Sequence, residues 1–363
     1  MTKVNEFFSA HYAEARDKFL AAATAASADL DCIENPNTGP DGGRLTTDTA
    51  WLGPQSASRL LVLNSATHGV EGFCGSGAQI GLLLSGDLDS LPADTAVLLI
   101  HAINPFGFAH LRRVNEDNVD INRNFVDHDA PHPANEPYDA VHAFLAPADW
   151  DGASRAAADR GIDDYIAARG EFAFQAAVTG GQYGHADGLF YGGRAPVWSN
   201  RVLHQIIDRQ VNGRAHVGFV DFHTGLGPRG YGEPIFVGQP NSADHRRARD
   251  WYGDDVTSPE VGDSKSAVVQ GTLSSAFTST LPPGTTYTGI ALEYGTVPVL
   301  DVLNALRADN WLHLHGDVGS PLGRDIKAQI RAAFYGDDDP WKTDIFARAR
   351  EIVSKGLAGL ANS

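Results

Sequence analysis

Four short, mainly apolar segments, each followed at once by polar residues, constrain the fold of this chain more than any other feature. They span residues 60–63, 95–100, 216–222 and 289–292. Runs of this length are typical of strands buried in a parallel sheet. Helical patterns separate them, and strands that alternate with helices indicate an α/β protein. We therefore expect a mixed, largely parallel twisted sheet flanked by helices, with its functional loops at the carboxyl ends of the strands.

Helical patterns also lie at both ends of the chain. Residues 5–28 carry Phe, Tyr and Leu at helical spacing, and further helices are expected over about 297–360, the first of them opened by a proline. Residues 125–150 are rich in Pro, His and Asp and predict a long connection, whereas 151–180 are Ala-rich and helical. Because nothing resembling a linker divides the chain, we expect a single catalytic domain over residues 1–363.

The charge balance bears on the partners of the protein. The chain has 28 Lys and Arg residues against 45 Asp and Glu residues, which gives a net charge of −17. That charge repels the phosphates of nucleic acids and anionic membrane surfaces. No segment approaches the ~20 apolar residues needed to span a bilayer. We therefore expect neither a nucleic acid nor a membrane as a partner.

The two cysteines, Cys32 and Cys74, are too few for a disulfide framework. The first residues lack the basic and apolar regions of an export signal, so a cytoplasmic location is expected. The alternative is a secreted chain that has lost a leader. Both thiols are interpreted as small hydrophobic residues, although Cys74 follows Glu71 closely enough to be considered as an extra metal ligand.

Residues with the chemistry of metal ligands directly follow two of the apolar segments. His68 and Glu71 form an H-x-x-E pair after the first segment, and His223 follows the segment that ends at residue 222. Two histidines and one glutamate leave an open position for water, as a catalytic zinc site requires. The ion would lower the pKa of that water and polarise a carbonyl group. Other divalent metals fit this set of ligands nearly as well.

Glu293 follows the last apolar segment directly. A carboxylate at the end of a buried strand must be solvated, paired or functional, because an isolated buried charge is costly. The functional interpretation is a general base that takes a proton from water and passes it to the leaving amine. The alternative is an ordinary surface glutamate at the end of a strand.

Arginines cluster in an otherwise acidic chain. Arg112 and Arg113 precede Asn122 and Arg123 by about ten residues. A guanidinium offers a planar fork of donors to a carboxylate, so the cluster favours binding of an anionic group. The alternative is a set of ion pairs with the acidic residues of segment 116–120.

A segment rich in glycine and aromatic residues spans 180–193. It is either a tight surface turn or a wall of the substrate pocket, and the sequence favours neither.

Taken together and in order, five motifs resemble the zinc carboxypeptidase superfamily. They are THGVEG (67–72), NPFGF (104–108), RRVNEDNVDINRNF (112–125), DFHTG (221–225) and LEYGT (292–296). The segments GLFYGG (188–193), WSN (198–200) and RADNWLH (307–313) are similar to an uncharacterised bacterial branch of that superfamily, known only as a domain of unknown function. The resemblance runs from about residue 55 to beyond 340.

The resemblance implies the roles of the metal-site residues. His68, Glu71 and His223 would bind one Zn²⁺ per chain, and Glu293 would be the general base and acid. Hydrolysis would proceed without a covalent intermediate.

The resemblance also implies how the substrate is held. Asn122 and Arg123 match the pair that binds a terminal carboxylate. Arg113 is the preferred counterpart of the arginine that stabilises the oxyanion, and Arg112 is then expected to assist substrate binding. The tyrosine that covers the substrate in this superfamily has no clear counterpart, with Tyr252 a candidate by position alone.

Three functions remain open from the sequence. The first is a carboxypeptidase-like hydrolase that cleaves an amide bond of a peptide with a free carboxylate. The second is a hydrolase of N-acyl amino acids or esters, as in the aspartoacylase and succinylglutamate desuccinylase relatives, which also resemble this chain in the short interval between Arg113 and Asn122. The third is a protein that binds a metal or a ligand without catalysis.

Overall fold

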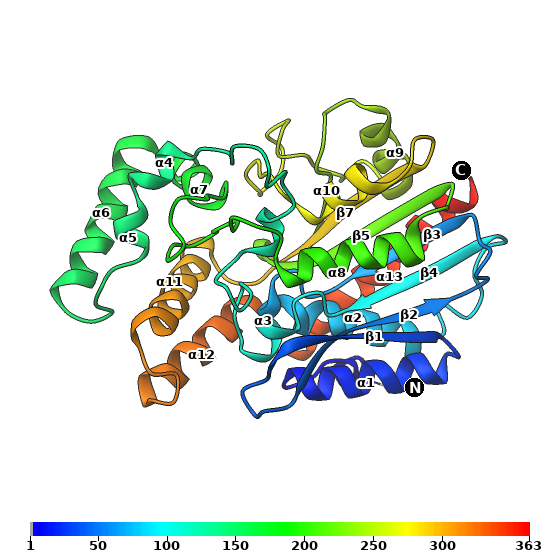
Figure 1. Cartoon of the computed structure of the whole chain (residues 1–363), viewed down its shortest axis with the longest axis horizontal. Coiled ribbons are helices and arrows are strands. Elements are labelled where there is room, and N and C mark those ends of the chain that lie inside the picture. The colour runs from blue at the N-terminus through cyan, green and yellow to red at the C-terminus, as the bar shows by residue number, and fades with distance from the viewer. Residues whose placement is uncertain (1–2) are drawn as a thin grey trace.

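A computed structural model describes residues 3–363. Its centre is a seven-stranded sheet in the order β1-β2-β4-β3-β5-β7-β6, drawn in Figure 1. The four neighbouring strands β4, β3, β5 and β7 are parallel, and β2, β1 and β6 are added antiparallel at the edges. This confirms the mixed, largely parallel sheet. The strands are β1 (Asp29–Thr38), β2 (Arg44–Leu52), β3 (Arg59–Asn64), β4 (Thr95–His101), β5 (His216–Arg229), β6 (Gly232–Ile235) and β7 (Thr286–Gly295).

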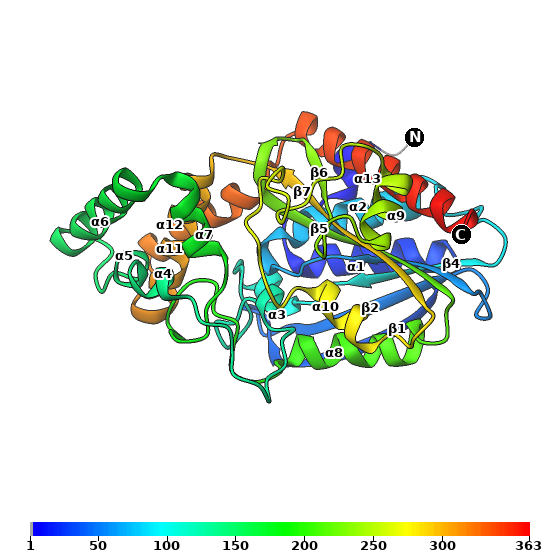
Figure 2. The ribbon, with the colours of Figure 1, turned by 90° about the horizontal axis from the view of Figure 1, so that it is seen from above.

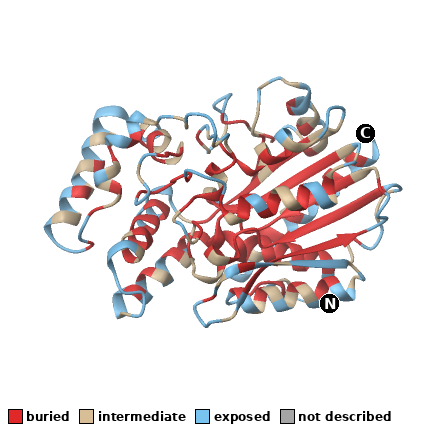
Figure 3. Cartoon of the chain, viewed as in Figure 1, coloured by how far each residue is buried: buried red, intermediate tan, exposed pale blue. Residues whose placement is uncertain are grey.

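Helices cover both faces of the sheet, as Figure 2 shows. One face packs against α1 (Tyr12–Ala25), α2 (Gly72–Leu84), α9 (Ala243–Tyr252) and α13 (Asp339–Ala361). The other packs against α8 (Trp198–Ile206), the π-helical turn η4 (Ile207–Val211) and α10 (Leu273–Thr280). In β3 the side chains of Leu61 and Leu63 lie in the first layer, and those of Leu60 and Val62 in the second. The central strands are buried (Figure 3) and carry apolar side chains on both faces, which explains their continuous apolar runs.

A group of helices stands beyond the carboxyl ends of the parallel strands. It contains α4 (Glu136–Asp139), α5 (His142–Leu145), α6 (Ala153–Arg169), α7 (Glu171–Thr179), α11 (Val299–His315) and α12 (Pro321–Phe334). These helices share one apolar cluster, and Figures 1 and 2 both place them at the same end of the sheet. They lie at the end of the sheet where the sequence predicts the functional loops.

The amino-terminal segment differs from the helix predicted over residues 5–28. The short 3-10 helix η1 (Val4–Phe7) is separated from α1, which begins at Tyr12. His11 has an extended backbone, and its Nδ1 accepts the N–H of Glu14 at 3.2 Å, so it caps α1 and sets its start. No helix within residues 3–363 combines the length and the apolar character needed to cross a bilayer.

Candidate metal centre

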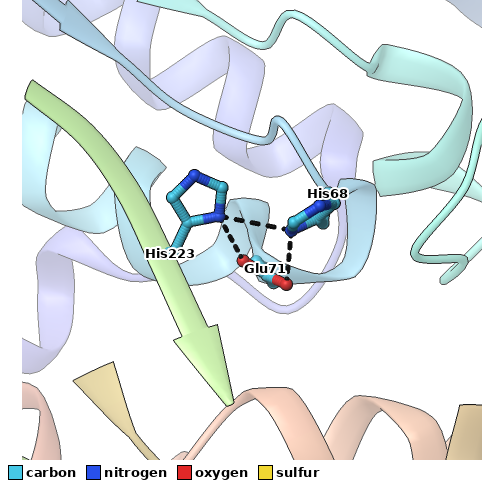
Figure 4. Close-up of side chains that lie close together, drawn as sticks. All are labelled: His68, Glu71 and His223. Atoms are coloured by element: carbon cyan, nitrogen blue, oxygen red, sulfur yellow. Dashed lines mark hydrogen bonds and ion pairs between the residues drawn. The ribbon is translucent and has the colours of Figure 1, made fainter. Parts of the chain in front are cut away.

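The three predicted metal ligands lie together beyond the carboxyl end of β3 and beside the middle of β5, which continues past His223 to Arg229 (Figure 4). His68 precedes the 3-10 turn η2 (Gly69–Glu71), Glu71 ends that turn, and His223 lies in β5. His68 Nδ1 is 2.8 Å from Glu71 Oε1, and His223 Nδ1 is 3.1 Å from Glu71 Oε2. The two Nδ1 atoms are 3.2 Å apart. All three side chains are buried, so the sequence motifs correspond to one compact cluster of donor atoms.

The turn that carries His68 and Glu71 is held against residues 107–113. The backbone N–H groups of Gly69 and Val70 donate to the carbonyl oxygens of Arg113 and Arg112 at 3.0 and 2.8 Å. A Cβ atom on Gly69 would lie 2.0 Å from the carbonyl carbon of Gly107, in α3 (Pro105–Ala109). Two backbones therefore approach each other where a side chain cannot fit.

Replacing Gly69 with Ala should destabilise the protein by about 1–3 kcal/mol, because backbone atoms of Gly107 must move to admit the methyl group. The same change should weaken metal binding, since η2 carries Glu71. Gly184→Ala is the matched control, because its Cβ would meet no atom within 4 Å. Urea denaturation and metal titration of both variants test this, and equal stability of the two would contradict the tight backbone contact.

Each imidazole of the cluster is backed by a second carboxylate. His223 Nε2 lies 2.8 Å from Asp221 Oδ2, and His68 Nε2 lies 3.1 Å from Asp120 Oδ1. Neither aspartate was predicted from the sequence to act at the metal site. The role of Asp221 could have been predicted, because it precedes His223 by two residues in the same strand and its side chain therefore lies on the same face. Carboxylates placed in this way orient metal-bound histidines and raise their basicity.

The donor set fits a divalent cation. A neutral imidazole that donates from Nε2 to an aspartate presents a lone pair at Nδ1. His223 presents such a lone pair to Glu71 Oε2 and His68 Nδ1, which lie 3.1 and 3.2 Å away, and acceptors this close repel one another unless a proton or a cation lies among them. Burial lowers the pKa of His223, but Asp221 and Glu71 outweigh this and raise it well above its usual value. The cluster therefore favours positive charge, as a cation site does.

Glu293 lies beside this cluster. In the parallel pairing of β5 with β7 it is the register partner of His223, and its Oε1 accepts the N–H of Leu226 at 3.1 Å. Burial and the negative charge of Glu71 raise the pKa of Glu293 to about 8. A carboxyl group with a pKa near neutrality can both accept and release a proton, so this position suits a general base.

Arg113 reaches the cluster, whereas Arg112 does not. The Nη1 of Arg113 donates to Glu71 Oε1 at 3.0 Å, and its Nη2 lies 2.8 Å from His68 Nε2. Arg112 is buried elsewhere, 3.4 Å from Asp309 Oδ2 of α11. The structure thus corrects the prediction that Arg112 assists substrate binding, because its guanidinium points away from the site to an ion pair.

Asn122 and Arg123 lie in the 3-10 turn η3 (Ile121–Arg123) and line the same cavity as the cluster. Arg123 is buried, and its guanidinium donates to the carbonyl oxygens of Thr179 and Asn122. Within residues 3–363 it forms no ion pair with a carboxylate. Asn122 Oδ1 accepts the N–H of Leu273 at 3.0 Å, which leaves the amide N–H groups for another partner. A buried, unpaired cation beside these N–H groups suits a carboxylate.

The segment 180–193 contributes Phe190 to the cavity wall, whereas residues 184–187 form a largely exposed turn, so each of the two interpretations describes part of it. Phe190 lines the cavity, with its ring centroid 5.0 Å from Cζ of Arg113 and 5.8 Å from Cζ of Arg123. Its backbone φ of 53° is unusual for a residue other than glycine. The hydroxyl of Tyr183 donates to the carbonyl oxygen of Arg123 at 2.6 Å. The segment therefore supports both arginines.

Two further candidates from the sequence lie away from the donor atoms. Cys74 is buried in α2, and the structure places it in none of the possible ligand groups found within residues 3–363. Tyr252 is fully buried in α9 and does not line the cavity, which excludes it as a residue that covers the substrate.

Comparisons with known proteins place this chain in context. The model of a family described as a protein of unknown function (DUF2817) matches residues 8–348, which confirms the expected resemblance to a domain of unknown function. No curated protein matches the chain.

Several solved structures are similar to this chain. A carboxypeptidase A from Helicoverpa armigera is 13% identical, with a TM-score of 0.45 over 89% of this chain and 73% of that one. The bovine thrombin-activatable fibrinolysis inhibitor is 11% identical, with a TM-score of 0.44 over 98% of both chains. A succinylglutamate desuccinylase from Silicibacter is 12% identical, with a TM-score of 0.39 over 80% of this chain and 67% of that one.

Proposed function

The chain belongs to the DUF2817 family of proteins of unknown function, and we propose that it is a metal-dependent hydrolase that cleaves an amide bond of a substrate with a free carboxylate. One observation carries this proposal. His68 and His223 line one cavity of about 190 Å³ together with the raised-pKa carboxyl of Glu293 and the unpaired guanidinium of Arg123, and Glu71 completes the donor cluster beside the two histidines.

The residues would divide the chemistry among them. His68, Glu71 and His223 would hold the ion, which when bound supplies a Lewis acid and lowers the pKa of water. Zn²⁺ suits two imidazoles and one carboxylate, at one ion per chain. Glu293 would accept the proton of the attacking water and deliver it to the leaving amine. Arg113 would stabilise the negative charge that develops on the carbonyl oxygen.

Asn122 and Arg123 would fix the far end of the substrate. A carboxylate bound there would supply an ion-pair partner for the buried guanidinium of Arg123. Because this cation is already desolvated, pairing with the carboxylate favours binding. Holding that end positions the amide bond against the general base. This supports carboxypeptidase-like cleavage next to a free carboxylate.

A second candidate is an N-acyl amino acid hydrolase, which would use the same residues. It is favoured by the apolar side chains of α7 and α11 that line the cavity, because they offer an acyl group an apolar surface. A protein that only binds metal is the weaker alternative, because Glu293 is buried at a cost that catalysis would justify.

Replacing Arg123 with Gln should lower kcat/KM for a free-carboxylate substrate by about 10–150-fold, the usual loss of a hydrogen bond to a charged group. Activity on the matching amidated substrate should change little, so the preference for the free acid disappears. Arg112→Gln is the control, because it breaks a buried ion pair outside the cavity and should keep the preference. An unchanged preference in Arg123→Gln would contradict the assignment.

A further inference from the structure

The cavity extends beyond the polar centre along an apolar wall supplied by two helices. This wall, termed the α7–α11 wall, consists of Phe174 and Val178 of α7 and Val299, Leu300, Leu303 and Leu306 of α11. Val299 and Leu300 are adjacent in the first turn of α11 and are 45% and 44% exposed. Adjacent exposed apolar side chains at the rim of a cavity indicate a surface that a ligand covers.

The α7–α11 wall begins next to the proposed carboxylate anchor. Arg123 donates to the carbonyl oxygen of Thr179, the last residue of α7. Val178 and Phe174 lie one and five positions before Thr179, so the apolar surface of α7 runs away from Arg123 for about a turn and a half at 3.6 residues per turn. A substrate held by its carboxylate therefore has an apolar surface close to its anchor.

Charge is scarce on this wall. The titratable residues that line the cavity are two members of the metal cluster, the proposed base, the two arginines and two further carboxylates: His68, His223, Glu293, Arg113, Arg123, Asp221 and Glu171. Glu171, in the first turn of α7, is the one charged residue that the helices α6, α7, α11 and α12 contribute to this lining. Being acidic, it repels a second carboxylate. The wall thus accepts an uncharged apolar group and disfavours a dicarboxylic acyl group such as succinyl.

We propose that the substrate is an N-acyl amino acid with a medium-length apolar acyl chain, which lies against the α7–α11 wall while its carboxylate binds Asn122 and Arg123. This inference rests on the proposed function and specifies its substrate class. Hydrolysis would break the amide C–N bond, with water adding hydroxyl to the acyl carbon and a proton to the amine. The products are a fatty acid and a free amino acid.

Binding to zinc-loaded Glu293→Gln protein, measured by calorimetry, separates recognition from turnover. The probes are N-octanoyl-, N-acetyl- and N-succinyl-phenylalanine, which differ in the acyl group alone. Each buried methylene adds roughly fourfold in affinity, so the octanoyl compound should bind at least about 30-fold more tightly than the acetyl compound. The succinyl compound should bind no better than the acetyl compound.

Two arginine substitutions on α11 locate the acyl site. Leu300→Arg places a charge on the α7–α11 wall and should reduce the preference for octanoyl to less than about fivefold. Leu314→Arg is its match, because Leu314 is 40% exposed on the same helix and does not line the cavity. It should retain the full preference. Loss of preference in both variants, or in neither, would overturn the placement.

The failures of the two proposals can be told apart. If the wild-type protein cleaves the acetyl and succinyl compounds and their binding equals that of octanoyl, the hydrolase proposal stands and the apolar acyl site is overturned. If octanoyl binds preferentially and none of the compounds is cleaved, the acyl site stands and the hydrolase proposal fails.

Discussion

Glu293→Gln should lower kcat/KM by about 10²–10⁴-fold, the usual contribution of a general acid–base residue. The expectation follows from position and charge, since the carboxyl is buried beside the metal cluster with its pKa raised to about 8. Gln has the same size and cannot take up a proton. The protein should still bind one metal ion, because Glu293 is not among the three donors of the cluster. Steady-state kinetics and metal analysis of the same samples provide the measurement.

A second buried glutamate supplies the control. Glu233 pairs with Glu293 across β6 and β7, and its Oε1 accepts hydrogen bonds from Thr257, Ser264 and Lys265. Glu233→Gln removes a charge from the same part of the sheet but should retain activity within about tenfold. If both variants lose activity equally, the effect of Glu293→Gln reflects disruption of the sheet rather than loss of a base.

Glu71→Gln should abolish tight metal binding and, with it, activity. Each carboxylate oxygen of Glu71 faces an imidazole Nδ1, and Thr224 donates to Oε2 at 3.0 Å. The amide of Gln lacks the negative charge and presents N–H groups where the cation would lie. Asp221→Asn, which alters the partner of His223 and not a donor, should lower metal affinity by a smaller factor of about 10–100. Competition titration with a chelating dye measures both.

A second group of possible ligands provides a control for the loss of metal binding in Glu71→Gln. His142, His185 and Asp187 also lie close together, on α5 and in the segment 180–193. Asp187→Asn should leave the tightest metal site unchanged. If Asp187→Asn loses tight metal binding and Glu71→Gln keeps it, the metal binds at the His142, His185 and Asp187 group. That result would contradict the proposed metal centre.

The central strands were predictable from the sequence because packing on both faces leaves a continuous apolar run, as in Leu60–Leu63. The strands β1 and β2 were not. The side chain of Asp48 in β2 is buried but polar, and Arg16 of α1 neutralises it at 2.8 Å. A buried ion pair between segments some thirty residues apart leaves no local apolar pattern, so hydrophobic periodicity indicates no strand there.

The site was predictable to the extent that its residues lie in short motifs. His68 and Glu71 share one turn, and His223 and Glu293 end neighbouring apolar runs. The choice between Arg112 and Arg113 depended on Asp309, which binds Arg112 from nearly two hundred residues away. No local pattern carries that information. Likewise the apolar wall combines α7 and α11, whose proximity arises only when the chain folds.

The most direct test of a metal-dependent amide hydrolase is mass spectrometry of a mixed library of peptides and N-acyl amino acids. The library is incubated with zinc-loaded wild-type protein and, in parallel, with the Glu293→Gln variant. We expect cleavage next to a free carboxylate by the wild-type protein and none by the variant, with the products identifying the substrate class. An unchanged library with both metal-loaded proteins, or the same cleavage by both, would contradict the proposed function.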